Sequence, residues 1–152
     1  MADDGPRRWD GPAGFWVSDD RSLVDVGRVH HWLATESYWA RGRPYDVVAR
    51  SVAESLTLGL YRPGGEQVGV CRWVTDFATF AWLCDVFVDT AVRGSGLGTF
   101  LVERATDHPA VRDLRLQVLG TRDAHGLYRR VGFQPLTRAE RWMERRPGAG
   151  PA

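Results

Sequence analysis

The chain has 152 residues, 43% of them apolar, and its 20 basic residues are all arginine, against 19 acidic residues. This length predicts one domain with a sizeable core, and the absence of lysine excludes a Walker phosphate loop, a pyridoxal Schiff base and a lysine nucleophile. With a net charge of +1 and no block of five like charges, the sequence predicts neither a nucleic-acid-binding nor a membrane-binding surface.

The chain ends and the cysteines indicate how the protein is organised and where it works. Residues 1–12 mix charges with Gly and Pro, and 147–152 consist of Pro, Gly and Ala, so we expect loose ends around one domain at 13–146. Cys71 and Cys84 lie in apolar segments without the spacing of a disulfide scaffold or metal site, which indicates a reducing compartment. No leader sequence opens the chain, and no apolar run approaches the roughly 20 residues of a membrane span. We therefore expect a soluble, cytoplasmic protein.

Hydrophobic periodicity and turn residues predict one strand, two helices and a hairpin in the first half of the chain. Val26, Val29 and Leu33 share one helical face after Asp25, which suits a helix start. Pro44 suits the start of the second helix. In chain order, the expected elements are a strand at 15–18, a helix from Asp25 that ends before Gly42, a helix at about 45–56, and hairpin strands at 58–62 and 67–75.

The second half alternates strands and helices around a glycine-rich loop. Residues 80–89 are almost unbroken in hydrophobicity, which predicts a central strand covered on both faces. The glycine-rich residues 93–98 follow it. After them we expect a helix at 99–106, a strand at 114–119, a helix at 125–130 that ends at Gly132, and a candidate for one more strand at 133–144.

The glycine-rich loop is the clearest chemical signal in the sequence. Its residues are Arg93, Gly94, Ser95, Gly96, Leu97 and Gly98. A loop between a buried strand and a helix offers backbone N–H groups and a helix N-terminus, which together bind phosphate. The dinucleotide-binding fingerprint is excluded, because Thr99 occupies the sixth position counted from Gly94, where glycine is needed. The alternative is a flexible loop without a ligand.

Two motifs carry a resemblance to a known family. Residues 86–98, Val-Phe-Val-Asp-Thr-Ala-Val-Arg-Gly-Ser-Gly-Leu-Gly, resemble the acetyl-CoA-binding motif of the Gcn5-related N-acetyltransferases (GNATs), which is Arg or Gln, two residues, Gly, one residue, then Gly or Ala. Residues 127–133, Leu-Tyr-Arg-Arg-Val-Gly-Phe, are similar to the family's later element of Leu-Tyr, three residues and Gly-Phe. The order of elements over 15–144 agrees as well, so the resemblance covers most of the chain.

The resemblance implies an α+β fold with an acetyl-CoA site. We expect a mixed, mostly antiparallel central sheet of about six or seven strands, flanked by about four helices and splayed after the fourth strand, at Val88. Acetyl-CoA would place its pantetheine arm on that strand, where one N–H polarises the thioester, and its pyrophosphate on the loop. The expected cofactor-binding residues are Val86, Phe87 and Val88 on the strand, and Arg93, Gly94, Ser95, Gly96, Leu97, Gly98 and Thr99 in the loop and helix start.

The implied activity is acetyl-CoA-dependent N-acetylation of a primary amine, on a small molecule or a peptide, by direct attack on the thioester. No metal is implied, and a homodimer is one possible assembly. The alternative is a non-catalytic acyl-CoA-binding sensor on the same fold. A third hypothesis, a metal or nucleophile enzyme, has no ligand spacing to support it. Its residues would be Cys84, His30, His31, His108 and His125.

Amine acetylation needs a group that takes a proton from the amine and a group that neutralises the departing thiolate. Tyr128 stands at the family's general-acid position and is the expected donor. Asp85 is the first candidate base, because a carboxylate in an apolar strand is costly unless it is paired or functional; an ion pair with an arginine is the alternative. His125, three residues before Tyr128 on nearly the same helix face, is the rival base. Weaker candidates are Asp76, Glu36 and a chain of water molecules.

The family builds its acceptor site between the first two helices, here residues 36–44. Trp39 is expected to stack on the acceptor, and Arg41 or Arg43 to bind a carboxylate or phosphate on it. The alternative is a structural tryptophan beside solvated arginines. Three strand residues either line the acceptor cleft or fill the core: Trp73, Phe80 and Trp82. Of these, the two tryptophans are our candidates for acceptor binding.

Overall fold

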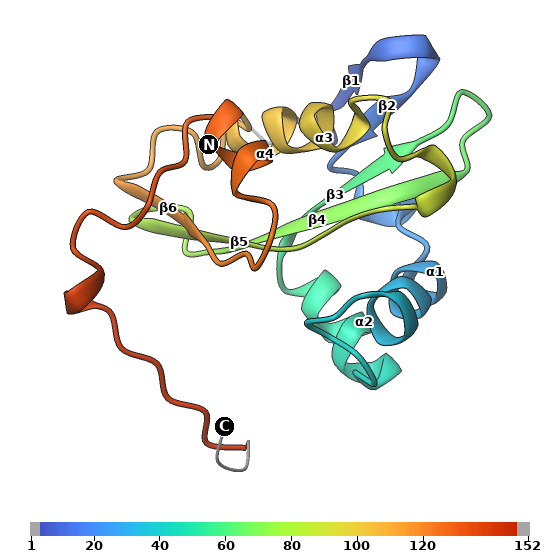
Figure 1. Cartoon of the computed structure of the whole chain (residues 1–152). Helices are drawn as coiled ribbons and strands as arrows, with labels where there is room; N and C mark the ends of the chain where they lie inside the picture. Colours follow the sequence, from blue (N-terminus) through green and yellow to red (C-terminus); the bar gives the residue numbers. More distant parts are fainter. Residues whose placement is uncertain (1–3, 149–152) are drawn as a thin grey trace.

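Six strands form one sheet in the spatial order β1-β2-β3-β4-β5-β6 in the computed structural model, which describes residues 4–148 (Figure 1). Every neighbouring pair is antiparallel except β5 and β6, which run parallel. The mixed, mostly antiparallel sheet predicted from the sequence is therefore confirmed. The strands are β1 (Arg8–Asp10), β2 (Trp16–Ser18), β3 (Leu56–Tyr61), β4 (Gln67–Thr75), β5 (Phe80–Val88) and β6 (Leu116–Leu119).

Helices cover both faces of this sheet, α3 and α4 on one face and α1 and α2 on the other (Figure 1). α1 begins after Asp25, as predicted, because the carboxylate of Asp25 accepts a hydrogen bond from the Arg28 N–H (3.0 Å). The α-helices are α1 (Val26–His31), α2 (Tyr45–Ala53), α3 (Leu97–Thr106) and α4 (His125–Arg130); shorter elements are a π-helical turn (Trp32–Glu36) and 3₁₀ turns at Pro12–Gly14, Arg21–Leu23, Thr90–Val92 and Ala139–Arg141.

Two apolar clusters pack against the sheet, one on each face. The larger joins the sheet to α3 and α4, and the smaller joins it to α1 and α2. In the smaller cluster, Trp32 stacks on Phe87 with ring centres 5.5 Å apart. Because successive strand residues point to opposite faces, Val86 and Val88 pack on the other side, against the α3–α4 cluster. The side chains at this end of β5 are thus divided between the two clusters.

The N-terminal segment is more ordered than the sequence predicts. The expectation of a loose segment at 1–12 is wrong for Arg8–Asp10, which pairs with β2 as an edge strand; the first three residues lie outside the described part of the chain. A long-range contact explains the order. The Nε2 of His108 lies 2.8 Å from the carboxylate of Asp19, directly after β2. The Nδ1 of His108 accepts a hydrogen bond from Ala110 (3.0 Å), so Nε2 carries the proton and donates to Asp19.

The C-terminal segment forms no strand in the described part of the chain, so the expectation of one more strand at 133–144 is wrong. Pro135 has no N–H to donate to a sheet, and the residues that follow it are mostly polar or charged. Instead, Trp142 lies against β5, with its ring centre 6.3 Å from that of Phe80. The expected flexible tail at 147–152 falls mostly outside the described residues.

β5 lies next to the edge strand β6 and is not covered on both faces, contrary to expectation. Ala81 and Leu83 are buried in the α3–α4 cluster, whereas Trp82 between them is 46% exposed. α1 and α2 lie beneath the other part of the sheet (Figure 1). One face of the first half of β5 is therefore left open by the helices.

Asp19→Ala should destabilise the fold by about 2–4 kcal/mol, because the buried His108 ring and the backbone N–H of Arg7 lose their acceptor. The control is Asp10→Ala, which removes an exposed ion pair with Arg8 (2.9 Å) and should cost less than about 1 kcal/mol. Urea unfolding followed by circular dichroism measures both variants. Equal losses would contradict the anchoring role of Asp19.

Candidate functional site

The pairing between β5 and β6 ends halfway along β5. It stops at the pair Leu83–Leu119, whereas β5 stays paired with β4 as far as Val88. No other strand in the described part of the chain takes the open side, so the backbone of residues 84–87 presents unpaired polar groups there. The predicted splay is confirmed, but it begins after Leu83 rather than at Val88.

A β-bulge turns Asp85 out of the regular alternation of β5. The register between β4 and β5 shifts by one residue, so that Asp85 and Val86 together lie opposite Cys71. Asp85 has φ = 52°, in the left-handed region that non-glycine residues rarely adopt. Leu83 faces the α3–α4 cluster, and regular alternation would send Asp85 the same way. The bulge instead directs its carboxylate to the face that carries α1 and α2.

The carboxylate of Asp85 is buried among three donors. It accepts hydrogen bonds from the indole N–H of Trp39 (2.9 Å) and from the guanidinium groups of Arg43 (2.8 Å) and Arg72 (2.7 Å). Burial acts to raise the pKa of Asp85, but the positive charges and the hydrogen bonds of these partners outweigh it and hold the pKa below its ordinary value. A carboxylate held in this way stays ionised and is a weak proton acceptor. The geometry thus favours the ion pair over the base.

This ion pair connects segments that are far apart in the sequence. Arg72 belongs to β4, Asp85 to β5, and Trp39 and Arg43 to the segment between α1 and α2. Arg72 also donates to the hydroxyl of Ser55 (2.9 Å). Two residues expected to bind the acceptor, Trp39 and Arg43, are therefore held in place by Asp85, and Arg43 shares that single carboxylate with Arg72.

Trp39 keeps part of its ring open to solvent beside a second aromatic residue. It is 40% exposed and meets Tyr38 edge to face, with ring centres 5.0 Å apart. Arg122, in the loop after β6, lies over the Tyr38 ring at 3.7 Å, and its backbone N–H donates to the Tyr38 hydroxyl (3.1 Å). Sequence reasoning missed this pair, because the two residues are 84 positions apart and no local pattern marks either.

The glycine-rich loop leads into α3 with its backbone N–H groups uncapped. Gly94 and Gly96 have φ = 86° and 79°, a conformation that glycine adopts without strain. Gly96 is the N-cap of α3, and no side chain bonds the first N–H groups of the helix. Those of Leu97, Gly98 and Thr99 therefore lack an acceptor within the helix and suit an anion.

Two side chains tie this loop to its surroundings. The Nε–H of Arg93 donates to the carbonyl of Val88 (2.8 Å), and its guanidinium lies 4.9 Å from the ring centre of Phe87. The hydroxyl of Ser95 donates to the carbonyl of Val92 (2.9 Å). The loop is thus fixed beside the end of β5, next to the unpaired stretch of that strand.

Tyr128, on α4, lines a cavity of about 250 Å³. Burial is the largest influence that raises the pKa of its phenol above the ordinary value. Its hydroxyl makes no hydrogen bond to another residue in the described part of the chain and can therefore donate to a ligand. His125, one turn earlier, lines the same cavity and is exposed. Tyr128 and His125, the two site residues predicted on α4, thus line the same cavity.

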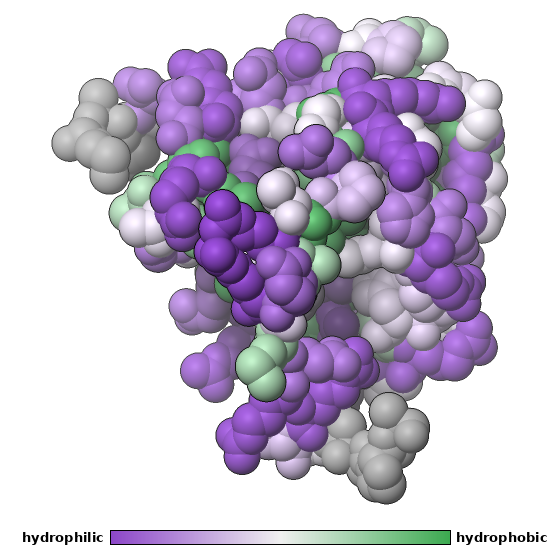
Figure 2. All heavy atoms as spheres, turned by 60° about the vertical axis from the view of Figure 1, so that its left-hand side comes forward, coloured by the Kyte–Doolittle hydropathy of each residue, from purple (hydrophilic) through white to green (hydrophobic). Residues whose placement is uncertain are grey.

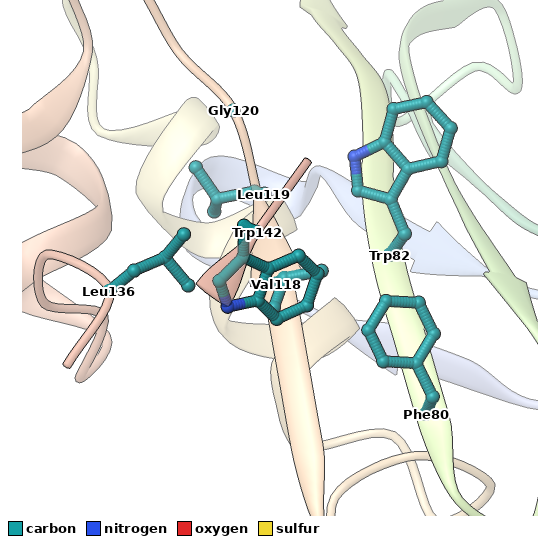
Figure 3. Close-up of a pocket in the computed structure, with 7 residues that line it drawn as sticks. All are labelled: Phe80, Trp82, Val118, Leu119, Gly120, Leu136 and Trp142. Carbon is teal, nitrogen blue, oxygen red and sulfur yellow. The ribbon is translucent and has the colours of Figure 1, made fainter. Parts of the chain in front are cut away.

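An apolar cavity of about 280 Å³ adjoins this one at the end of β6 (Figure 3). The two cavities share Val118, Leu119, Gly120 and Leu136. On the side of the molecule that Figure 2 brings forward, hydrophobic areas lie between strongly hydrophilic ones. Sequence reasoning missed Leu136 and Trp142, because they lie among polar and charged residues without periodicity. The lining residues are Phe80, Trp82, Val118, Leu119, Gly120, Leu136 and Trp142.

The residues of the metal-or-nucleophile hypothesis are scattered. In residues 4–148, no three His, Cys, Asp or Glu side chains gather as a metal-binding group, and no helix is long and apolar enough to cross a membrane. The ring of His30 bonds to the carbonyl of Arg43 (3.1 Å), while His108 belongs to the N-terminal anchor. Burial raises the pKa of both free thiols, Cys71 and Cys84, which makes them poor nucleophiles.

Residues 52–135, more than half of the chain, match the family model of the acetyltransferase (GNAT) domain. This chain belongs to the GNAT family. A crystal structure of a candidate GNAT-family acetyltransferase from Xanthomonas campestris pv. campestris is 40% identical, with a TM-score of 0.85 over 90% of this chain and 95% of that one. The family and the α+β fold inferred from the two motifs are confirmed.

Two further relatives of this GNAT are more distant. A candidate acetyltransferase from Gibberella zeae is 28% identical over 116 residues. The match covers 64% of this chain and 65% of that protein, so the chain spans just under two thirds of the length of this curated relative. Rv2747 from Mycobacterium tuberculosis, solved in complex with CoA, is 23% identical, with a TM-score of 0.60 over 74% of this chain and 68% of that one. The second likeness shows the fold alone.

The residues that the sequence suggests for acceptor binding in this GNAT differ in their surroundings in the structure. Trp73 is wrong as an acceptor residue, because it is fully buried and its indole N–H donates to the carbonyl of Ala105 (3.0 Å). Trp82 lines the apolar cavity, and Trp39 lies near the Asp85 ion pair. Arg41 is exposed and forms no ion pair with a residue in the described part of the chain.

Asp85→Asn should destabilise the fold by about 3 kcal/mol at neutral pH, because two guanidinium groups lose the charge between them. The pKa of Asp85 is lower in the folded than in the unfolded state, so this stabilisation is present above about pH 4 and is lost as the pH falls through the folded pKa. The difference between wild type and variant should therefore shrink in acid, as urea titrations from pH 7 to pH 2 measure. Asp113→Asn, in an exposed pair with Arg112, is the control.

Asp85→Asn also tests the alternative hypothesis that Asp85 is the general base. If Asp85 were the base, Asp85→Asn would recover its acetylation rate at alkaline pH, where the acceptor amine is already neutral, and would keep the stability of the wild type. We expect neither result. A pH–rate profile beside the unfolding curves decides between the two roles.

Proposed function

We propose that this GNAT binds acetyl-CoA and transfers the acetyl group to a primary amine. The observation that carries the proposal is the meeting of two unpaired backbone segments, the open side of β5 and the uncapped start of α3. The first suits an extended, amide-containing arm, and the second suits a pyrophosphate. Coenzyme A contains both groups. The CoA bound by the Mycobacterium tuberculosis relative supports the assignment.

The position of Gly98 supports a ligand close to the loop backbone. Its φ is not in the left-handed region, and an added Cβ would meet only the Cγ2 of Val88, at 3.9 Å. The protein itself therefore does not require glycine there, whereas an anion on the neighbouring N–H groups would. We assign the pyrophosphate to the backbone of Gly94, Ser95, Gly96, Leu97, Gly98 and Thr99, and the pantetheine arm to Val86, Phe87 and Val88.

The proposed reaction is direct attack of a neutral amine on the thioester carbonyl carbon. The C–N bond forms and the C–S bond breaks. An ammonium acceptor loses two protons in all, of which one ends on the sulfur of CoA and the other passes to solvent. A backbone N–H of residues 86–88 on the open side of β5 is the candidate donor to the carbonyl oxygen, worth about 3 kcal/mol of barrier by comparison with single donors elsewhere.

Two side chains of α4 serve the proton transfers in this proposal. The raised pKa of Tyr128 keeps its phenol protonated, and a thiol with a pKa near ~8.5 is the stronger acid, so Tyr128 stabilises the leaving thiolate as a hydrogen-bond donor. His125 lines the same cavity and accepts the amine proton, alone or through water. Asp85 has no part in this path, because Arg43 and Arg72 already share its charge.

Gly98→Glu should weaken acetyl-CoA binding by about 100-fold or more, because a carboxylate would repel the pyrophosphate from the α3 N-terminus. The fold should be retained, since a Cβ at this position has room. Gly64→Glu is the matched control, in the turn between β3 and β4, where an added Cβ meets nothing within 4 Å. Isothermal titration calorimetry and thermal melting measure both variants. Normal affinity of the Gly98 variant would refute the site.

Tyr128→Phe should lower kcat by about 10²–10⁴-fold and leave acetyl-CoA affinity nearly unchanged. Because the pKa of Tyr128 is raised, the wild-type enzyme should show no loss of rate from phenol ionisation up to about pH 10. Thiol release at saturating acetyl-CoA measures the rate. Tyr45→Phe, at a tyrosine that is 53% exposed on α2, is the control. A kcat equal to that of the control would remove Tyr128 from the reaction.

A further inference from the structure

The apolar cavity is built on the face of β5 that the helices leave open. Phe80 and Trp82 share that face, because the residues on either side of Trp82 point into the α3–α4 cluster (Figure 3). Val118 is the β6 partner of Trp82. Trp142, from the C-terminal segment, stacks on Phe80 at 6.3 Å and completes the wall.

The lining of this cavity selects against charged and sugar-like ligands. It contains no charged side chain and no hydroxyl, and its side chains offer only the indole N–H groups of Trp82 and Trp142. A carboxylate, a phosphate or a sugar would lose its hydration there without gaining partners. The volume of about 280 Å³ is near the lower end of ligand pockets, which hold roughly 300–1,000 Å³. One ring or a short hydrocarbon chain fits this description.

The cavity is continuous in its lining with the one that contains Tyr128. Gly120 belongs to both and follows the last residue of β6, at the point where β5 and β6 separate. An added Cβ at Gly120 would meet nothing within 4 Å, so there is free space beside this shared residue. A nitrogen on a short linker from the apolar cavity would pass Gly120 toward the open side of β5.

We propose that this cavity holds the body of the acceptor, and that the acceptor is a hydrophobic amine, with an aromatic or aliphatic group on a short linker and no carboxylate. The inference rests on the proposed N-acetyltransferase function. The ammonium group loses water as it passes the uncharged lining of this cavity on its way to the open side of β5, which lowers its pKa and favours the neutral nucleophile. The faces of Trp82 and Trp142 attract the cation before it loses its proton.

Three probe amines test the acceptor class. 2-Phenylethylamine carries a ring on a two-carbon linker, ethylamine lacks the ring, and phenylalanine adds a carboxylate. With acetyl-CoA saturating, thiol release should give 2-phenylethylamine a kcat/KM at least about tenfold above that of either other amine, since it alone combines a ring to bury with the absence of a carboxylate to desolvate. Higher kcat/KM for phenylalanine or ethylamine would overturn the proposal.

Variants locate the effect in the cavity. Trp82→Ala and Trp142→Ala should each raise the KM for 2-phenylethylamine by about tenfold, with kcat and acetyl-CoA affinity within about twofold of the wild type. Met143→Ala is the matched control, because Met143 is 96% exposed and does not line the cavity. Gly120→Leu should lower kcat by closing the junction. Unchanged KM in both tryptophan variants would overturn the proposal.

Further measurements distinguish a failure of the proposed function from a failure of the acceptor inference. Calorimetry with acetyl-CoA comes first: if the wild-type protein does not bind it, the proposed function itself fails. If it binds acetyl-CoA, and the tryptophan fluorescence of the CoA-saturated protein shows no saturable change with 2-phenylethylamine, the acceptor inference alone is wrong. Light scattering gives the oligomeric state; a dimer that Trp82→Ala or Trp142→Ala dissociates would show that a second copy covers the cavity, and would overturn the inference too.

Discussion

The carboxylate of Asp85 is the contact on which the candidate site depends. It is directed to the α1–α2 face by a bulge, and there Arg72 from the neighbouring strand and Trp39 and Arg43 from the segment between α1 and α2 bond to it. The same bulge directly precedes the stretch of β5 that would receive the pantetheine arm. Without the carboxylate, two guanidinium groups would face each other and the bulge would lose its partners. One carboxylate thus connects the bulge in β5 to β4 and to the segment between α1 and α2.

The features predicted correctly from the sequence are those that neighbouring residues determine. Asp25 marks the start of α1 through its own hydrogen bond to the helix, and the alternating glycines from Gly94 mark the turn into α3. Strand β1 had no such signal, because three residues with a single apolar side chain are too few to define an alternation. A bond between Asp19 and His108, 89 positions apart, anchors the chain directly after its partner strand. Contacts of that range cannot be inferred from local pattern.

The tryptophans show the same limit within the candidate site. Trp73 and Trp82 both lie in predicted strands, and the sequence gives no reason to treat them differently. The register between strands decides: Trp73 points into the α3–α4 cluster, whereas Trp82 points to the face that the helices leave open. Asp85 is a further case, since its two alternatives differ only in whether an arginine reaches it, and the partners lie 13 and 42 positions away.

The proposed acceptor cavity and the Asp85 ion pair both bear on how the acceptor amine loses its proton. An amine with a lysine-like pKa of about 10.4 costs about 4.6 kcal/mol to deprotonate at pH 7, at roughly 1.36 kcal/mol per pKa unit. Asp85 is in no position to meet that cost, because its arginine partners lower its own basicity. In the proposed arrangement, loss of water along the uncharged lining lowers the pKa of the amine instead, and each unit by which it does so removes about 1.4 kcal/mol from the requirement. Because Asp85 is a weak base, the site needs an apolar acceptor pocket to make the amine neutral. A charged, hydrated pocket beside the same carboxylate would leave the amine protonated.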